Sequence, residues 1–276
     1  MNYRIRIVLV AVLCFALIRC TKEDNSTPPI DPPGNGDTTT LSFKYEDSVF
    51  YLKPGQEDYT VSPVTSRAGE YIGFPEGIEI NEKTGAINVS KSETGLKYLV
   101  SFIPQGSSDT LKTYITISGI NYLDGFYVLD DGDSIANPVY NGNPALSIPG
   151  INDGSVFDKD AGCNDNGCNV IPENAKINLA QTVRNGVFGD KPANNDRHEF
   201  ELVYQINDKS NKATNKLKVK LYYFKTVDDV TPEAYDIITS REGTILSSRT
   251  AAFKITGSQK TAKPRPPCIF IVGRSK

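Results

Sequence analysis

Residues 74–87 read Phe-Pro-Glu-Gly-Ile-Glu-Ile-Asn-Glu-Lys-Thr-Gly-Ala-Ile. Lys83-Thr84-Gly85 predicts a hairpin turn, because glycine adopts a positive φ without a steric penalty. Apolar and polar residues alternate around this turn, which is the period of a strand with one buried face. The stretch therefore predicts short strands whose isoleucines, Ile78, Ile80 and Ile87, fill a core.

Runs with the same period of two surround this turn on both sides. In the last of them, residues 110–118, odd-numbered side chains face one way and even-numbered side chains the other. A sheet packed on one side requires this alternation. Several short strands without a helical period predict a β-sandwich over residues 41–119.

The same motif resembles the immunoglobulin-like, cadherin-like repeats of bacterial surface proteins. Those repeats share Pro-x-Gly-Leu, an apolar–polar alternation and Thr-Gly-x-Ile, followed by a glycine before the next strand. Here the corresponding residues are 74–87, followed by Thr94-Gly95-Leu96. The resemblance implies an Ig/cadherin-like β-sandwich and little about function, because such modules serve as spacers, adhesion units and appendages of enzymes.

A second β-rich domain is expected over residues 120–248. It contains the clearest hairpin of the chain, in which residues 198–206 and 216–224 both alternate. Glu199 and Glu201 are expected to face lysines of the second strand on the solvent side, each pair stabilising by only tenths of a kcal/mol. One short helix should follow over residues 231–241, because threonine is a good N-cap and proline suits the first helical position.

Two cysteines lie five residues apart, at Cys163 and Cys168. In an oxidising exterior this spacing favours a disulfide that closes a loop. A zinc site would need further cysteine or histidine ligands, and His198 is the one histidine of the chain. The acidic residues around the pair, Asp158, Asp160 and Asp165, are weak candidates for calcium, and solvated turns are the commoner role of such loops.

Residues 249–276 form a basic C-terminal tail with seven lysines and arginines and no acidic residue. Its apolar run, residues 268–272, allows a late edge strand, a disordered basic end or a departure from the natural family ending. The sequence alone does not choose among these three.

The N-terminus carries an export signal. A basic head and a 12-residue apolar run, residues 7–18, match a signal peptide over residues 1–19 and are shorter than a membrane-spanning helix. Leu17-Ile18-Arg19-Cys20 resembles a bacterial lipobox, in which the cysteine is lipidated, although Arg19 stands where a small residue is usual. The alternatives are ordinary cleavage or an uncleaved anchor.

The residues after the cysteine are Thr21-Lys22-Glu23-Asp24. Lys22, Glu23 and Asp24 resemble the Lys-acid-acid export tether of Bacteroidetes surface lipoproteins. This resemblance implies an outer-membrane protein that is lipid-anchored at Cys20 and faces the cell exterior. The rest of residues 20–40 is rich in Pro, Gly and Thr, so it is expected to be a flexible linker.

Composition limits the classes of partner. The chain has 30 Lys+Arg and 33 Asp+Glu, and removal of residues 1–19 leaves 27 against 33, a net charge of about −6. This balance argues against nucleic acid, which needs a basic face. Four Asp-Ser/Thr-apolar triplets resemble O-glycosylation signals of exported Bacteroidetes proteins, with acceptors Thr38, Ser48, Thr110 and Ser134.

No motif names a reaction, so an enzyme is not expected and neither is a cofactor. Hydrolysis would need a placed carboxylate pair such as Asp130 with Glu173, and nothing in the sequence favours that pairing. The leading hypothesis is a surface module that binds an extracellular glycan or a cell-envelope protein. Six tyrosines would offer stacking faces for a sugar if they were exposed: Tyr122, Tyr127, Tyr140, Tyr204, Tyr222 and Tyr223. If they are buried, a passive spacer or assembly subunit is favoured instead.

Overall fold

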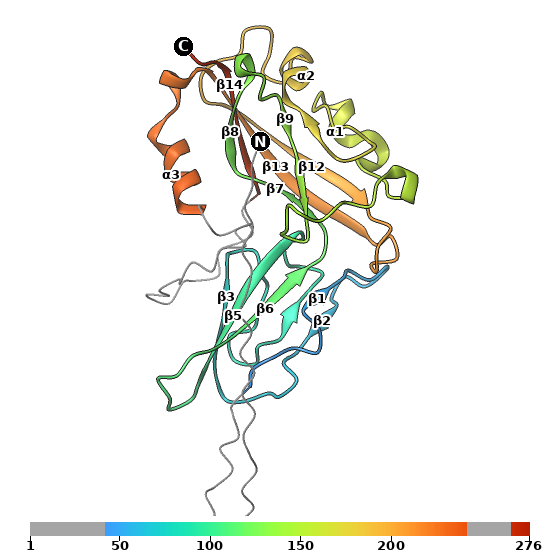
Figure 1. The fold of residues 1–276 in the computed structure, drawn as a ribbon, viewed down its shortest axis with the longest axis vertical. Helices are drawn as coiled ribbons and strands as arrows, with labels where there is room; N and C mark the ends of the chain where they lie inside the picture. Colours follow the sequence, from blue (N-terminus) through green and yellow to red (C-terminus); the bar gives the residue numbers. More distant parts are fainter. Residues whose placement is uncertain (1–41, 242–265) are drawn as a thin grey trace, which may run out of the picture. The chain divides into compact units, whose positions relative to one another are not determined.

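Each of two four-stranded sheets contains a long antiparallel hairpin (Figure 1). The computed structural model describes residues 42–241 and 266–276. Strands account for 37% and helices for 14%, so the predicted mainly β class is confirmed.

The first sheet has the strand order β1-β6-β5-β3. Its strands are β1 (Val49–Phe50), β3 (Gly69–Phe74), β5 (Leu96–Pro104) and β6 (Leu111–Ile117). β1 runs parallel to β6, whereas β5 is antiparallel to both of its neighbours. Alternate side chains enter one core, which includes Tyr98, Val100, Phe102, Ile115 and Ile117.

The turn predicted at Lys83-Thr84-Gly85 is present, with Gly85 at a φ of 70°. A bridge pairs Ile80 with Ile87 across it, and the isoleucines of the motif are buried as expected. A Cβ at Gly85 would lie 2.6 Å from ring atoms of Tyr71. Glycine is therefore needed here for space as well as for its φ.

The second sheet has the strand order β12-β13-β14-β8. Its strands are β12 (Asp196–Gln205), β13 (Thr214–Thr226), β14 (Cys268–Arg274) and β8 (Gly125–Val128). β12 and β13 form the predicted hairpin, and β14 runs parallel to both β13 and β8. One face packs on a large core that contains Leu202, Leu221, Ile269 and Ile271, and the other packs against α3 (Pro232–Arg241).

The position of β14 corrects the predicted boundary at residue 248 and the prediction of a separate basic tail. Residues 268–274 are an interior strand of the second sheet, not an edge strand. Ile269 and Ile271 enter the core on one face, while Phe270 and Val272 enter the core on the other. An uninterrupted apolar run is what a strand covered on both faces needs.

The remaining strands are short and form two-stranded pairs. They are β2 (Thr60–Val61) with β4 (Ile87–Asn88), β7 (Ile120–Tyr122) with β10 (Pro138–Tyr140), and β9 (Ile135–Ala136) with β11 (Ile177–Asn178). The described residues also contain four 3-10 turns: η1 (Leu129–Asp131), η2 (Ile151–Asp153), η3 (Lys159–Ala161) and η4 (Val227–Asp229).

The described residues contain three α-helices, whereas the sequence predicted one. The predicted helix is α3, which begins at Pro232. The additional helices are α1 (Gly162–Asp165) and α2 (Leu179–Arg184), and they lie on the face of the second sheet opposite α3 (Figure 1). Both are too short to show a periodic pattern, since four to six residues make little more than one turn.

A hydrogen-bonded turn unit occurs twice in the chain. In the first copy the amide of Gly85 donates to the carbonyl of Asn81, and in the second the amide of Ala175 donates to that of Ile171. Matching residues of the two copies are separated by a constant distance along the sequence, so Asn88 corresponds to Asn178. The side chain of each accepts a hydrogen bond from the backbone amide three residues later. Ser92 and Thr182 occupy matching positions and bond back to the Asn88 and Asn178 carbonyls.

The strands beside the two turn units also correspond. β2 pairs with β4 through Val61 and Ile87, and β9 pairs with β11 in the same register through Ala136 and Ile177. Tyr45 pairs with Pro63 ahead of the first unit, and Tyr122 pairs with Pro138 ahead of the second. The protein is thus built from two copies of one architecture, each with a turn unit followed by a long hairpin.

The two copies differ at both edges of their main sheets. In the first copy, β3 lies against β5, the first strand of the hairpin. In the second, β12 has no such neighbour among the described strands and is an edge strand. In the first copy, β1 pairs directly with β6; in the second, β14 lies between β8 and β13. Within the part of the chain that the structure describes, the second sheet therefore has β14 in addition and no counterpart of β3.

Candidate functional site

A groove of about 1090 Å³ runs beside β12, on the side where the first sheet has β3. We call it the β12 groove. Its residues come from β12, from α1 and the turn after it, and from the end of α2. They are Gly162, Asn164, Asp165, Asn166, Gly167, Asn185, Gly186, Val187, His198, Glu199, Phe200, Glu201 and Val203. A space of this size is at the upper end of ordinary ligand pockets.

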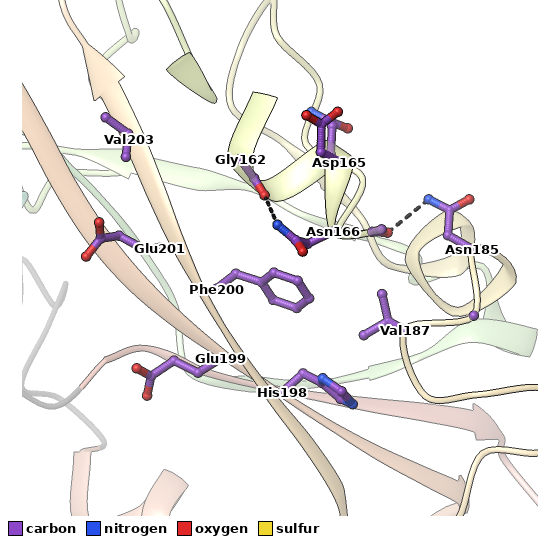
Figure 2. Close-up of a pocket in the computed structure, with 13 residues that line it drawn as sticks. Gly162, Asp165, Asn166, Asn185, Val187, His198, Glu199, Phe200, Glu201 and Val203 are labelled. Carbon is purple, nitrogen blue, oxygen red and sulfur yellow. Dashed lines mark hydrogen bonds between the residues drawn. The ribbon is translucent and has the colours of Figure 1, made fainter. Parts of the chain in front are cut away.

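The groove has an apolar centre and a polar rim. Figure 2 shows the Phe200 ring between Asn166 and Val187, with His198 beside it. The imidazole of His198 packs edge-on against Phe188, with 5.4 Å between ring centroids. Amide side chains and the carboxylate of Asp165 lie around this centre, whereas the carboxylates of Glu199 and Glu201 point to the opposite face of β12 (Figure 2). Such an arrangement offers hydrogen bonds around a small apolar contact.

A hydrogen bond joins two walls of the groove, the turn after α1 and the end of α2. The Asn185 amide, at the end of α2, donates to the Gly167 carbonyl at 2.9 Å. The Asn166 amide donates to the Gly162 carbonyl at 2.8 Å and closes the turn after α1. Both bonds are drawn in Figure 2. These amides therefore fix the shape of the rim, since each links two backbone segments.

On the opposite face of β12, the predicted ion pairs with β13 are present. Glu201 lies 3.0 Å from Lys216, and Glu199 lies 3.1 Å from Lys218 and 3.9 Å from Lys220. All of these side chains are exposed, so each pair contributes little stability. Their effect is to balance the charge of the two glutamates along the groove.

The carboxylate of Asp158 holds α1 in place. Asp158 is 6% exposed and accepts hydrogen bonds from the Cys163 amide at 2.7 Å and from the Asn164 amide at 2.9 Å. The Asn164 side chain donates to the same carboxylate at 2.6 Å. Buried carboxylates need partners of this kind.

The hydrogen bonds of Asp158 affect whether Asp158, Asp160 and Asp165 could bind calcium together. Asp160 and Asp165 are exposed, while Asp158 is buried and bonded to the backbone. Within residues 42–241 and 266–276, no three acidic, cysteine or histidine side chains gather as a metal site would require. Asp158, Asp160 and Asp165 therefore do not come together as calcium ligands.

Cys163 and Cys168 are free thiols in the structure, so the predicted disulfide is not formed there. Both side chains are buried in one core because the turn between them folds back: the Cys168 amide donates to the Cys163 carbonyl at 3.0 Å. The hydrogen bond with Cys168 and burial raise the pKa of the Cys163 thiol far above its usual range. The Cys163 thiol also donates to the Glu201 carbonyl on β12, at 3.6 Å.

The tyrosines do not form a stacking face for a sugar. Four of the six are buried: Tyr122, Tyr140, Tyr204 and Tyr222. Tyr127 and Tyr223 are half-buried and pack against the large core. Strand alternation explains this outcome, because it turns half of the aromatic side chains inward.

The other predicted sites fall in different places. Ser48 and Thr110 are exposed and Ser134 is half-buried, while Thr38 lies outside the described residues. Cys20 and the tether Lys22, Glu23 and Asp24 also lie outside them. In the described part of the chain, no helix is both long enough and apolar enough to span a membrane.

The carboxylate of Asp130 has a structural partner. It accepts hydrogen bonds from the Ser275 amide, at 2.9 and 3.0 Å, and so fastens the end of β14. The predicted role of His198 as a strand residue of the hairpin is confirmed.

No family model matches the chain, and no curated protein matches it either.

Sequence analysis did not identify the β12 groove. It found β12 and its charges, but the rim comes from asparagines and glycines in loops whose position depends on the tertiary fold. The one local signal was the concentration of Asn and Gly between residues 162 and 167 and again at Asn185-Gly186. Such pairs mark turns, and the turns become a site when they meet beside an open strand.

Proposed function

We propose that this protein is an exported lipoprotein that is anchored to the outer membrane through Cys20 and faces the cell exterior. The signal over residues 1–19 and the tether at Lys22, Glu23 and Asp24 support this address. Residues 20–40 are then a stand-off linker, and the acceptors at Ser48 and Thr110 are exposed where a glycan would be added.

We further propose that the two repeated units are Ig/cadherin-like domains that act by binding rather than by catalysis. The motif at residues 74–87 supports this class for the first unit, and the matching turn unit at residues 168–182 extends the argument to the second. No described feature of the groove supplies a nucleophile activated by a base.

The observation that carries the binding function is the β12 groove. It combines an open strand, an apolar centre at Phe200 and Val187, and a rim of fixed amides. Its ligand would be a macromolecule of the cell exterior or envelope, because the anchor confines the protein to that surface. Stacking of a sugar on the six tyrosines receives no support, since they are buried or half-buried.

The address is tested by surface protease accessibility on intact cells. The wild type should be digested, Cys20→Ala should lose membrane association, and replacement of Lys22, Glu23 and Asp24 by Ala should protect the protein from digestion. If the wild type resists digestion on intact cells, the proposed orientation is wrong.

Binding is tested with arrays of envelope glycans and envelope proteins. Val187→Arg puts a long cation into the groove, and Val64→Arg is the control because Val64 is 57% exposed and does not line the groove. A ligand of the groove should be lost in the first variant and kept in the second. If no ligand on either array responds to Val187→Arg, the passive spacer or assembly subunit is the better description, and the burial of the tyrosines already favours it.

A further inference from the structure

We infer that the β12 groove receives an extended segment of a partner polypeptide, which adds to the open edge of β12 as an antiparallel strand. This inference rests on the proposed binding function of the same groove and names the class of its ligand. The partner would be recognised mainly through its backbone, as in other cases of strand addition.

The first argument is the comparison of the two copies within the chain. Each copy has a turn unit followed by a hairpin, but among residues 42–241 and 266–276 only the hairpin of the first copy has a third strand on its outer side. There, β3 pairs antiparallel with β5 over six residues, Gly69–Phe74. In the second copy the corresponding position beside β12 is occupied by the groove. The architecture therefore has a place for a strand that the described residues do not fill.

The second argument is the direction of the backbone groups of β12. The Gln205 amide donates away from β13, to the carbonyl of Val156, at 2.8 Å. Alternate residues of a strand direct their backbone groups to the same side, so Glu199, Glu201 and Val203 also point outward. Within the described residues, the backbone amides of these three have no hydrogen-bond partner.

One outward group of this edge already bonds across the groove. The Glu201 carbonyl accepts from the Cys163 thiol at 3.6 Å. This contact confirms the direction of the carbonyl, and a thiol is only a weak donor. An incoming backbone amide would be a stronger partner for the same oxygen.

The third argument is the match between the groove and the outward groups. Glu199, Glu201 and Val203 themselves line the groove, together with His198 and Phe200, so the open space reaches the outer edge of the strand as well as its core-facing side. The edge is closed at one end, where Val156 pairs with Gln205. The added segment would thus be short and would end near Val203.

The surroundings also define the side chains of the partner. One side of an added strand would face Phe200 and Val187, so an apolar or aromatic residue fits there. The first sheet shows the equivalent contact: Tyr71 of β3 stacks on Phe102 of β5, with 4.4 Å between ring centroids. The other side would face the ion pairs of Glu199 and Glu201, so polar residues fit there.

Charged residues on an edge strand often serve to prevent strand addition. Glu199 and Glu201 do not repel a partner in this way, because lysines of β13 lie 3.0 to 3.1 Å from their carboxylates. The edge is therefore close to neutral, and the rim of α1 and α2 limits access to narrow, extended ligands.

The test uses the mature chain, residues 20–276 with Cys20→Ser, and a displayed library of random peptides of about ten residues. Enriched peptides are synthesised, and hydrogen exchange is measured with and without each. We expect slower exchange at Glu199, Glu201 and Val203, and about a tenfold loss of affinity in Glu199→Pro, which lacks the outward amide. Val64→Arg, an exposed position outside the groove, is the control and should bind like the wild type.

Two results would overturn the inference: a library without enrichment, or peptides whose binding neither slows exchange at these three amides nor weakens in Glu199→Pro. The exchange data decide the matter if Glu199→Pro does not fold. The same experiments distinguish failure of this inference from failure of the proposed binding function. A glycan that is lost in Val187→Arg, together with no peptide binding, would keep the groove as a binding site and remove the strand addition.

Discussion

The hydroxyl of Tyr45 donates a hydrogen bond of 2.6 Å to the carbonyl oxygen of Gly85. Tyr122 makes the same bond to the carbonyl of Ala175 in the second turn unit. In both cases the acceptor residue has a positive φ, 70° for Gly85 and 59° for Ala175. A buried tyrosine thus fixes the tightest point of each turn, and its hydroxyl satisfies a carbonyl that the turn leaves inside the protein.

Tyr45→Phe and Tyr122→Phe should each destabilise the protein by about 1–3 kcal/mol, because a buried carbonyl loses its partner while the ring remains. The measurement is the free energy of unfolding in urea. Tyr114→Phe is the matched control, since Tyr114 is 49% exposed. Equal stability of the three variants would show that these hydroxyls do not hold the turns.

The interior position of β14 gives a second prediction. The side chain of Phe270, on β14, is fully buried on the face of the sheet that packs against α3. Phe270→Ala should lower the free energy of unfolding by about 3–5 kcal/mol. Arg274→Ala, on the exposed end of the same strand, should change it by less than about 0.5 kcal/mol. Similar small effects for both variants would mean that the strand is not part of the core in solution.

The cysteine pair gives a third prediction. In an oxidising exterior, Cys163 and Cys168 should join, each thiol losing a proton while two electrons pass to an oxidant such as oxidised glutathione. Their side chains already lie in contact in one buried core, so little movement is needed. Of Cys163, Cys168 and Cys268, alkylation in denaturant without reduction, followed by peptide mass spectrometry, should modify only Cys268 in oxidised protein. Modification of all three cysteines after oxidation would contradict this.

Much of the fold follows from local sequence. The β12–β13 hairpin alternates over its whole length, and its charges predicted the observed pairs of Glu199 and Glu201 with lysines. The helix at Pro232 has strong start signals, because threonine precedes proline there. These elements were predictable because each is specified by its own residues.

Other features depend on distant contacts. The apolar run of β14 is typical of a strand buried on both faces, but nothing local reveals that β8 and β13 lie on its two sides. The internal repeat has a weak sequence signal, Ile87-Asn88 against Ile177-Asn178, and Ala175 replaces the glycine that marks the first turn. The groove was not predictable, since it is defined by a strand that the second copy lacks.

The last prediction concerns alkaline pH. Tyr204 is fully buried, and its hydroxyl contacts Thr94 Oγ1 at 2.9 Å and accepts from the Ile120 amide at 3.1 Å. Burial raises the pKa of Tyr204 from its ordinary value of 10 to about 12. The folded state therefore favours the protonated hydroxyl more than the unfolded state does, and this contribution is complete below pH 10 and is lost as the pH rises to about 12.

The free energy of unfolding should accordingly fall between pH 10 and pH 12. Urea unfolding across this range should show a shallower fall in Tyr204→Phe than in the wild type, by up to ~1.4 kcal/mol per pH unit, because one ionisable group has been removed. The comparison is between slopes, since the variant also loses two hydrogen bonds and is less stable at every pH. Parallel curves of unfolding free energy against pH would mean that Tyr204 ionises as readily in the folded chain as in the unfolded one. Its burial between the two repeated units would then be incomplete in solution.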